Sequence, residues 1–222
     1  MRTLSRPSLI PLLGFLISAL FAVLERWSVP EFGWSTWLSG LIFCYACIVS
    51  WAIHLLLTAP LEKAALEERL PFLAKLNKPT FTFLLVAFVL FAGFLAFRIY
   101  SFVFSFYGLF LSVFAEMQPE TLFGRNGFIN SDFYTPVFYL LRKFWPMALG
   151  TLIANLPIFL NPNKWHHVLL PFRFEILRMH LLTLALPFFS LLSWIIFKQN
   201  YQTITILLLL AVFYLLPQRQ SA

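Results

Sequence analysis

The stretch that decides the fold is Thr80–Phe114, TFTFLLVAFVLFAGFLAFRIYSFVFSFYGLFLSVF, in which Arg98 is the only charged residue. At about 1.5 Å per residue, a helix over this stretch would be about 52 Å long. The hydrocarbon core of a bilayer is only about 30 Å thick, so the stretch is too long for one upright span. Either one helix passes the membrane surface near Arg98 and continues as an interfacial or projecting helix, or the chain turns near Arg98 and crosses back.

Composition places the whole chain in a membrane. Hydrophobic residues make up 60% of the 222 residues and charged residues only 11%, whereas ordinary soluble domains carry roughly 25% charged residues. The net charge of +7 resides in short segments between apolar runs, where basic residues set orientation and contact anionic lipid. We therefore predict a single integral membrane domain over residues 1–222, in contact with phospholipids and without a nucleic-acid partner.

Six apolar runs predict an all-α, polytopic transmembrane bundle of six spans. The runs are Ser8–Leu24, Trp34–Leu57, Thr80–Phe114, Pro136–Leu160, a region Pro171–Phe197 that contains the fifth, and Tyr201–Leu216. A turn near Arg98 would give seven spans. Counting basic residues on the cytoplasmic side does not separate the two topologies. The segment Arg98-Ile-Tyr-Ser contains no Gly, Pro or Asn to make a tight turn, which favours six spans with a cytoplasmic N-terminus.

The segments between the runs add two expectations. The connectors Ala59–Leu76 and Asn161–Arg178 mix apolar and charged residues, which predicts short interfacial helices. Tryptophans are expected in belts at the two membrane surfaces: Trp27, Trp34, Trp37, Trp145 and Trp194 at the outer one, Trp51 and Trp165 at the inner one. The chain has no Asn-x-Ser/Thr glycosylation acceptor, which fits a bacterial inner-membrane protein.

Basic and aromatic residues form the first candidate site. An arginine inside an apolar helix is by default a candidate for function, because a charge in the bilayer is expensive. On a helix, Arg98 shares a stripe with Phe91 and Phe94. If Arg142 and Lys143 lie in the outer leaflet, they would join Arg98 in a basic cluster that holds an anionic headgroup, while the phenylalanines flank the acyl chain. The competing interpretation of Arg98 is an anchor at the headgroup level.

Metal and redox chemistry are not predicted. Cys44-Tyr-Ala-Cys47 has the C-x-x-C spacing, but these are the only two cysteines and no second pair could relay electrons. The four histidines, His54, His166, His167 and His180, show no metal-ligand spacing. We expect no metal and no cofactor. His54 remains a candidate polar contact near the inner end of its span.

The positions of the carboxylates argue against catalysis within the membrane, and Asn155 marks a second candidate polar site. All nine acidic residues lie outside the predicted spans, so neither a buried proton-loading carboxylate nor a catalytic carboxylate pair is expected. Asn155 precedes Pro157, and Gly150 and Ala154 form a small-x-x-x-small pair. These residues predict close helix packing, with a polar cavity beside the kink as the alternative.

The sequence therefore predicts a non-catalytic accessory or assembly subunit that packs against lipid, another membrane protein or a second copy of itself. One alternative is a protein that binds or translocates a lipid or amphipath through the basic and aromatic site. A second is a membrane-embedded enzyme that uses the polar loop of residues 115–134; whether the protein is an enzyme is left uncertain, leaning to no.

Overall fold

The computed structural model describes residues 9–60, 63, 68, 75–115, 134–160, 167–169, 171 and 175–215, and the structural statements below concern these residues. In this part of the chain, all regular secondary structure is helical, as predicted. In chain order the elements are α1 (Leu9–Leu24), α2 (Val29–Thr58), α4 (Lys78–Ala115), α6 (Tyr134–Ala154), α7 (Leu156–Leu160), η2 (His167–Leu169), α9 (Glu175–Phe197), η3 (Lys198–Asn200) and α10 (Tyr201–Leu215).

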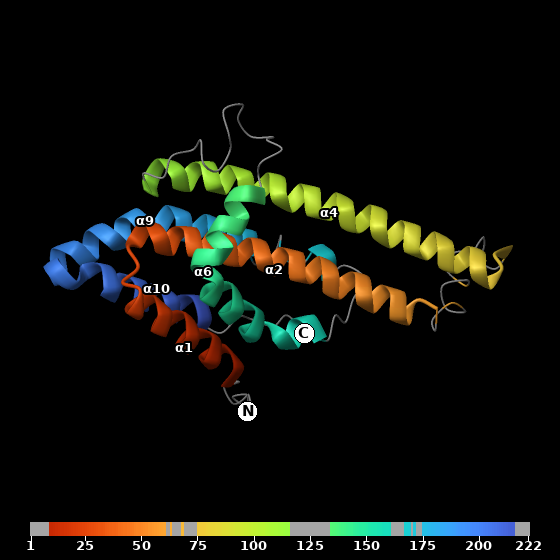
Figure 1. Ribbon diagram of the computed structural model, residues 1–222, viewed down its shortest axis with the longest axis horizontal. Helices are drawn as coiled ribbons and strands as arrows, with labels where there is room; N and C mark the ends of the chain where they lie inside the picture. The colour runs from red at the N-terminus through yellow and green to blue at the C-terminus, as the bar shows by residue number, and fades with distance from the viewer. Residues whose placement is uncertain are drawn as a thin grey trace.

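The helix α2 is the centre of the bundle. It contacts α4, α6 and α9, while α1 packs against α6 and α10. Figure 1 shows α4 lying beside α2 along almost its whole length and running in the opposite direction, and it shows α9 and α10 as a hairpin joined at η3. Side chains from α1, α2, α4, α6, α9 and α10 meet in one main buried cluster.

The long apolar stretch forms one unbroken helix. α4 extends from Lys78 to Ala115 without a turn at Arg98. The seven-span alternative required a turn there, so it was wrong. The physical reason is the one visible in the sequence: the residues around Arg98 are good helix or strand formers, and nothing among them interrupts the backbone hydrogen bonds.

After Arg98, α4 continues along the bundle, and an interfacial or projecting position for this half of the helix stays a prediction. The second half of α4 packs along the first half of α2: Trp37 Nε1 donates to the Phe104 carbonyl at 2.7 Å, and Leu111 is only 2% exposed. A Cβ placed on Gly33 would lie 3.3 Å from Leu111 Cδ2. The small residue in α2 lets α4 continue along the bundle instead of leaving it.

The fourth apolar run is a kinked helix followed by a short one. Within α6, Phe144 has non-helical angles (φ −112°, ψ 24°), two residues before Pro146. A proline removes one helical hydrogen bond and its ring crowds the preceding turn, which accounts for the kink. α6 then ends at Ala154, and α7 begins after Asn155.

Among the residues that the structure describes, four stretches of helix are long and apolar enough to cross a membrane: Val29–Thr58, Lys78–Leu109, Val137–Ala154 and Phe188–Tyr214. The fourth contains the turn η3, so it spans parts of both α9 and α10. α1 and α10 have 16 and 15 residues, fewer than the roughly 17–25 that a span needs. The chain is thus a helical protein with several membrane-compatible helices, and the count of six spans stays a prediction.

The tryptophans near the start of α2 do not form an outward-facing belt. Trp34 and Trp37 are 0% exposed and Trp27 is 2% exposed. The rings of Trp34 and Trp37 pack edge to face at 5.7 Å between centroids, a favoured arrangement for aromatic pairs. Of the tryptophans predicted at the outer surface, only Trp145 and Trp194 are exposed. The other three therefore belong to the protein interior.

A left-handed residue makes the turn between α1 and α2. Arg26 has φ 51°, Trp27 N–H donates to the Ala22 carbonyl at 3.0 Å, and Arg26 N–H donates to the Val23 carbonyl at 3.2 Å. This pair of bonds is the Schellman motif, in which the left-handed position is usually glycine. The turn closes correctly with arginine, at the cost of backbone strain.

Candidate functional site

Four buried hydroxyl groups from four helices meet at the centre of the bundle. Tyr214 OH of α10 lies 3.0 Å from Ser18 Oγ of α1 and 3.2 Å from Thr151 Oγ1 of α6. Thr151 Oγ1 is also hydrogen-bonded to Ser39 Oγ of α2. In an apolar environment an unsatisfied hydroxyl is costly. These mutual hydrogen bonds therefore connect the four helices.

Two glycines bring α1 and α6 into backbone contact beside these hydroxyls. A Cβ on Gly14 would lie 2.5 Å from the Gly150 carbonyl oxygen, and a Cβ on Gly150 would lie 2.5 Å from Ser18 Oγ. Real Cβ atoms do not approach other atoms so closely. We call the set Gly14, Ser18, Ser39, Gly150, Thr151 and Tyr214 the hydroxyl–glycine junction. It is packed too closely around the glycines to hold a ligand there, so its role is helix association.

Asn155 is placed at the helix break and bonds within its own helix. It is 4% exposed, and its Nδ2 donates to the Thr151 carbonyl at 2.9 Å. Its own carbonyl accepts from the backbone N–H groups of Ile158 at 2.9 Å and Phe159 at 3.3 Å. Asn155 thus satisfies backbone groups where α6 ends and α7 starts. Side-chain hydrogen bonds from α6 to α2 and α10 are made by Thr151, one helical turn earlier.

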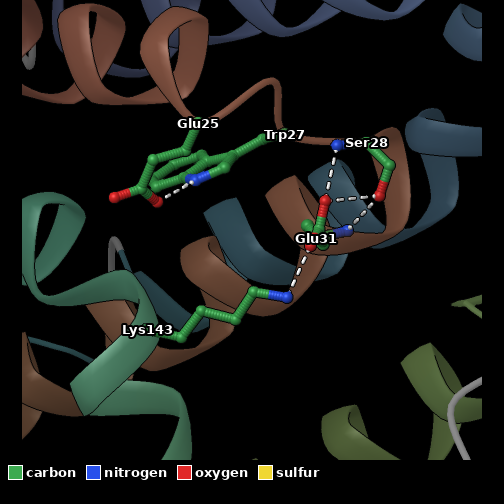
Figure 2. A network of polar contacts seen from close by, with 5 residues as sticks. All are labelled: Glu25, Trp27, Ser28, Glu31 and Lys143. Carbon is green, nitrogen blue, oxygen red and sulfur yellow. Dashed lines mark hydrogen bonds and ion pairs between the residues drawn. The ribbon is translucent and has the colours of Figure 1, made fainter.

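A polar network holds the middle of α6 against the start of α2 (Figure 2). Lys143 Nζ lies 2.5 Å from Glu31 Oε1. The other carboxylate oxygen of Glu31 accepts from the backbone N–H of Ser28 at 2.8 Å and from its hydroxyl at 2.9 Å. Next to them, Trp27 Nε1 donates to Glu25 Oε2 at 2.8 Å. Lys143 is therefore an ion-pair partner within the protein.

The role of Glu31 was not predicted from the sequence, although the sequence contains a signal for it. Ser28-Val-Pro-Glu31 has the S-x-x-E spacing of a capping box, in which the serine and the glutamate satisfy free backbone N–H groups at a helix start. Pro30 is favourable in the first turn of a helix. The predicted span began at Trp34 because hydropathy alone was used. The capping box sets the start of α2 at Val29, five residues earlier.

Arg98 lies on the outward side of α4. It is exposed, as are Phe91 (69%) and Phe94 (64%), so the predicted stripe is present. Contacts on the inward side fix its level along α2: Ser101 Oγ is 2.8 Å from Tyr45 OH, and a Cβ on Gly93 would meet Ile48 Cγ2 at 3.7 Å. Arg98, between positions 93 and 101, is therefore level with the middle of α2.

The structure does not bring Arg98 and Lys143 together. Lys143 is paired to Glu31 in the first turn of α2, and Tyr45, which is near the level of Arg98, lies 14 residues further along that helix. At about 1.5 Å per residue, the separation along α2 is about 20 Å. Arg142 is exposed beside Lys143 in α6. A single headgroup cannot contact all three basic side chains in this arrangement.

The cysteines and histidines give no candidate metal centre in the described ranges. Cys44 and Cys47 are buried, and His54 is half-buried in the last turns of α2. In these ranges, no three His, Cys, Asp or Glu side chains are close enough to hold a metal ion. The side chains of the other three histidines lie outside the described residues.

Two further predictions concern segments that lie wholly or mostly outside the described residues. These are the loop of residues 115–134, the candidate catalytic segment, and the connectors Ala59–Leu76 and Asn161–Arg178. They stay predictions.

Comparison of the chain with protein-family models, with curated proteins and with solved structures gave no match. The class that the fold defines is an all-helical protein with several helices long and apolar enough to cross a membrane. Within this class, function has to be argued from the surfaces and contacts described above.

Proposed function

We propose that the protein is a non-catalytic accessory or assembly subunit of a membrane complex, and that its outward α4 surface is the docking face. This surface, which we call the aromatic face, consists of Phe83, Phe88, Phe91, Phe94, Phe102 and Phe106, each between 47% and 71% exposed. In the proposed setting the chain is a six-span protein of a bacterial inner membrane, surrounded by phospholipid, with a cytoplasmic N-terminus.

The observation that carries the proposal is the one-sided packing of α4. Its inward residues, such as Leu85, Val89 and Tyr100, are buried against the rest of the bundle. The six phenylalanines are exposed, with Phe88 at the edge of the aromatic face, where its ring contacts Trp51 of α2. Large rigid aromatic groups give strong van der Waals packing, which drives helix association where the hydrophobic effect is absent. A helix that only separates the bundle from lipid does not need this concentration of rings.

The organisation of the interior agrees with a structural role. Several of its buried hydroxyls bond to one another or to backbone carbonyls: Tyr214 bonds to Ser18, Ser50 to Phe159, and Tyr100 to Val168. Groups that are already satisfied and tightly packed are suited to holding helices together. Chemistry would instead require polar groups directed at a substrate.

The test is purification of the tagged full-length protein from its native membranes in mild detergent, with mass spectrometry of the co-purified proteins. The proposal expects a stoichiometric membrane-protein partner that the double variant Phe91→Ala, Phe94→Ala loses while it remains folded by circular dichroism. Phe188→Ala is the matched control, because Phe188 is 75% exposed on a different helix, α9. Purification as a monomer without a partner, or equal retention of the partner by both variants, contradicts the proposal.

A further inference from the structure

Arg98 is the charged residue in the middle of the aromatic face. It lies four residues from Phe94 and four from Phe102, so the three side chains occupy one side of successive helical turns. Its side chain is exposed. Within the part of the chain that the structure describes, its guanidinium forms no hydrogen bond, ion pair or ring contact.

The surroundings of this guanidinium are apolar in both directions along α4. Phe83 is 15 residues before Arg98 and Phe106 is eight residues after it, and both are exposed. These separations correspond to about 22 Å and about 12 Å along the helix axis. The arginine side chain is shorter than either distance. If the bilayer covers the surface from Phe83 to Phe106, which is about 34 Å long, the guanidinium is too far from the headgroup phosphates at either end to contact them.

A carboxylate on a helix that packs beside α4 can pair with the Arg98 guanidinium directly. An ionised side chain within an apolar membrane region is stabilised by an opposite charge. Arginine pairs well with a carboxylate because its planar group donates two parallel hydrogen bonds. We propose that Arg98 forms an ion pair with an Asp or Glu in a transmembrane helix of a different protein, and that this helix packs against the aromatic face. This inference rests on the proposed function and names the chemistry of its partner.

Within the helices that the structure describes, no acidic position of a second copy of this chain lies beside Arg98. Among the described helical spans, the acidic residues stand in the first turns: Glu31 in α2 and Glu175 in α9. Glu31 is committed to Ser28 and Lys143. Glu175 precedes Ile176, whose carbonyl accepts from Tyr107 OH, nine residues beyond Arg98 on α4. In a copy packed alongside in the same orientation, neither of these two helix positions is level with Arg98.

The test uses defined probes in place of the unknown partner. The full-length protein is reconstituted in phosphatidylcholine vesicles with a Leu/Ala-rich transmembrane peptide of about 20 residues that carries one central Glu, or Gln in the control peptide. Association is measured by fluorescence energy transfer. A polar interaction between membrane helices of about 1–2 kcal/mol corresponds to a roughly tenfold difference in affinity. We expect the Glu peptide to bind about tenfold more tightly than the Gln peptide.

Two variants and a second lipid composition show whether Arg98 is the residue that binds the Glu peptide. Arg98→Gln should remove the preference for Glu while remaining folded by circular dichroism, and Arg142→Gln, which changes an exposed arginine on α6, should retain it. Equal binding of the two peptides, or a preference that survives Arg98→Gln, overturns the inference. Loss of the preference when phosphatidylglycerol is added also overturns it, because lipid phosphate would then be the partner of Arg98.

The outcomes of this test and of the native purification are independent. If the aromatic-face variant loses a co-purified partner but the two peptides bind equally, the assembly function is supported and only the ion pair is refuted. Absence of a partner in the purification removes the assembly function itself.

Discussion

Lys143 and Glu31, 112 positions apart in the chain, form an ion pair of 2.5 Å, and the same Glu31 closes the capping box of α2 through Ser28. One carboxylate therefore serves two purposes: it starts the central helix and holds α6 against it. The side chains of Lys143 and Glu31 are 40% and 25% exposed, so the ion pair is partly screened by its surroundings.

The two roles of Glu31 are expected to contribute different amounts to the free energy of unfolding. Lys143→Ala removes only the ion pair and should lower the free energy of unfolding by less than about 1 kcal/mol. Glu31→Ala also removes the capping box and should cost about 1–2 kcal/mol. The measurement is unfolding in mixtures of mild detergent and dodecyl sulfate, with Arg142→Ala as the exposed control. An equal loss for Lys143→Ala and Glu31→Ala would show that the ion pair, not the cap, is the main contribution.

Adding a methyl group at Gly14 or Gly150 should separate α1 from α6. Each new Cβ would come within 2.5 Å of an existing atom, and at Gly14 that atom is the backbone carbonyl oxygen of Gly150, which cannot rotate away. Overpacking of this kind costs about 1–3 kcal/mol, so we expect losses of that size in the same unfolding measurement. The matched control is Gly93→Ala in α4, where the new Cβ would be 3.7 Å from Ile48 Cγ2.

The control should show no loss, because Gly93→Ala makes an ordinary van der Waals contact and alanine favours a helix over glycine by about 1 kcal/mol. If Gly14→Ala and Gly93→Ala have the same effect, the backbone contact between α1 and α6 is not as close as described.

The tyrosine hydroxyl at the junction should contribute a measurable part of the stability. Tyr214→Phe keeps the ring and removes hydrogen bonds to Ser18 and Thr151. The expected loss is about 1–2 kcal/mol, and a double-mutant cycle with Ser18→Ala should give a coupling energy of about 0.5–1 kcal/mol. Tyr139→Phe is the control, because Tyr139 is 65% exposed. Purely additive effects of the Tyr214 and Ser18 substitutions would contradict the direct bond.

Arg26→Gly should stabilise the protein. Arg26 occupies the left-handed position of the Schellman turn with φ 51°, a conformation that costs a residue with a Cβ about 1–2 kcal/mol and glycine almost nothing. We expect the free energy of unfolding to rise by about 1 kcal/mol. Arg26→Ala keeps the strain and removes the charge, so it separates the two effects. A gain from Arg26→Ala as large as that from Arg26→Gly would assign the effect to the side chain instead.

Much of the helical framework could be read from apolar runs, because a membrane-compatible helix needs an uninterrupted stretch with few charges. α1 and α10 begin and end within one residue of the predicted runs. The start of α2 was missed because it depends on capping by Ser28 and Glu31, a polar signal that hydropathy ignores. The break at Asn155 depends on local backbone bonding and is not visible in hydropathy either.

The predicted basic and aromatic site is present only in the part that lies on a single helix. Arg98, Phe91 and Phe94 share a face because helical spacing dictates it. The relation of Arg98 to Lys143 depends on how far α4 and α6 are shifted along α2, and no property of either helix alone determines this. The burial of Trp34 and Trp37 has the same origin, since an amphipathic indole can lie at a lipid surface or inside a bundle, depending on its neighbours.

The hydroxyl–glycine junction has a consequence for biosynthesis. Ser18 and Tyr214 are 196 positions apart, and the ribosome adds about 5–20 residues per second, so α1 is made roughly 10–40 s before its α10 partner exists. Gly14 packs against Gly150 of α6, 136 positions later, so this contact can form only about 7–27 s after Gly14 is made. Until then, Gly14 and Ser18 face lipid or an insertion factor, because α1 is made before both helices that cover it.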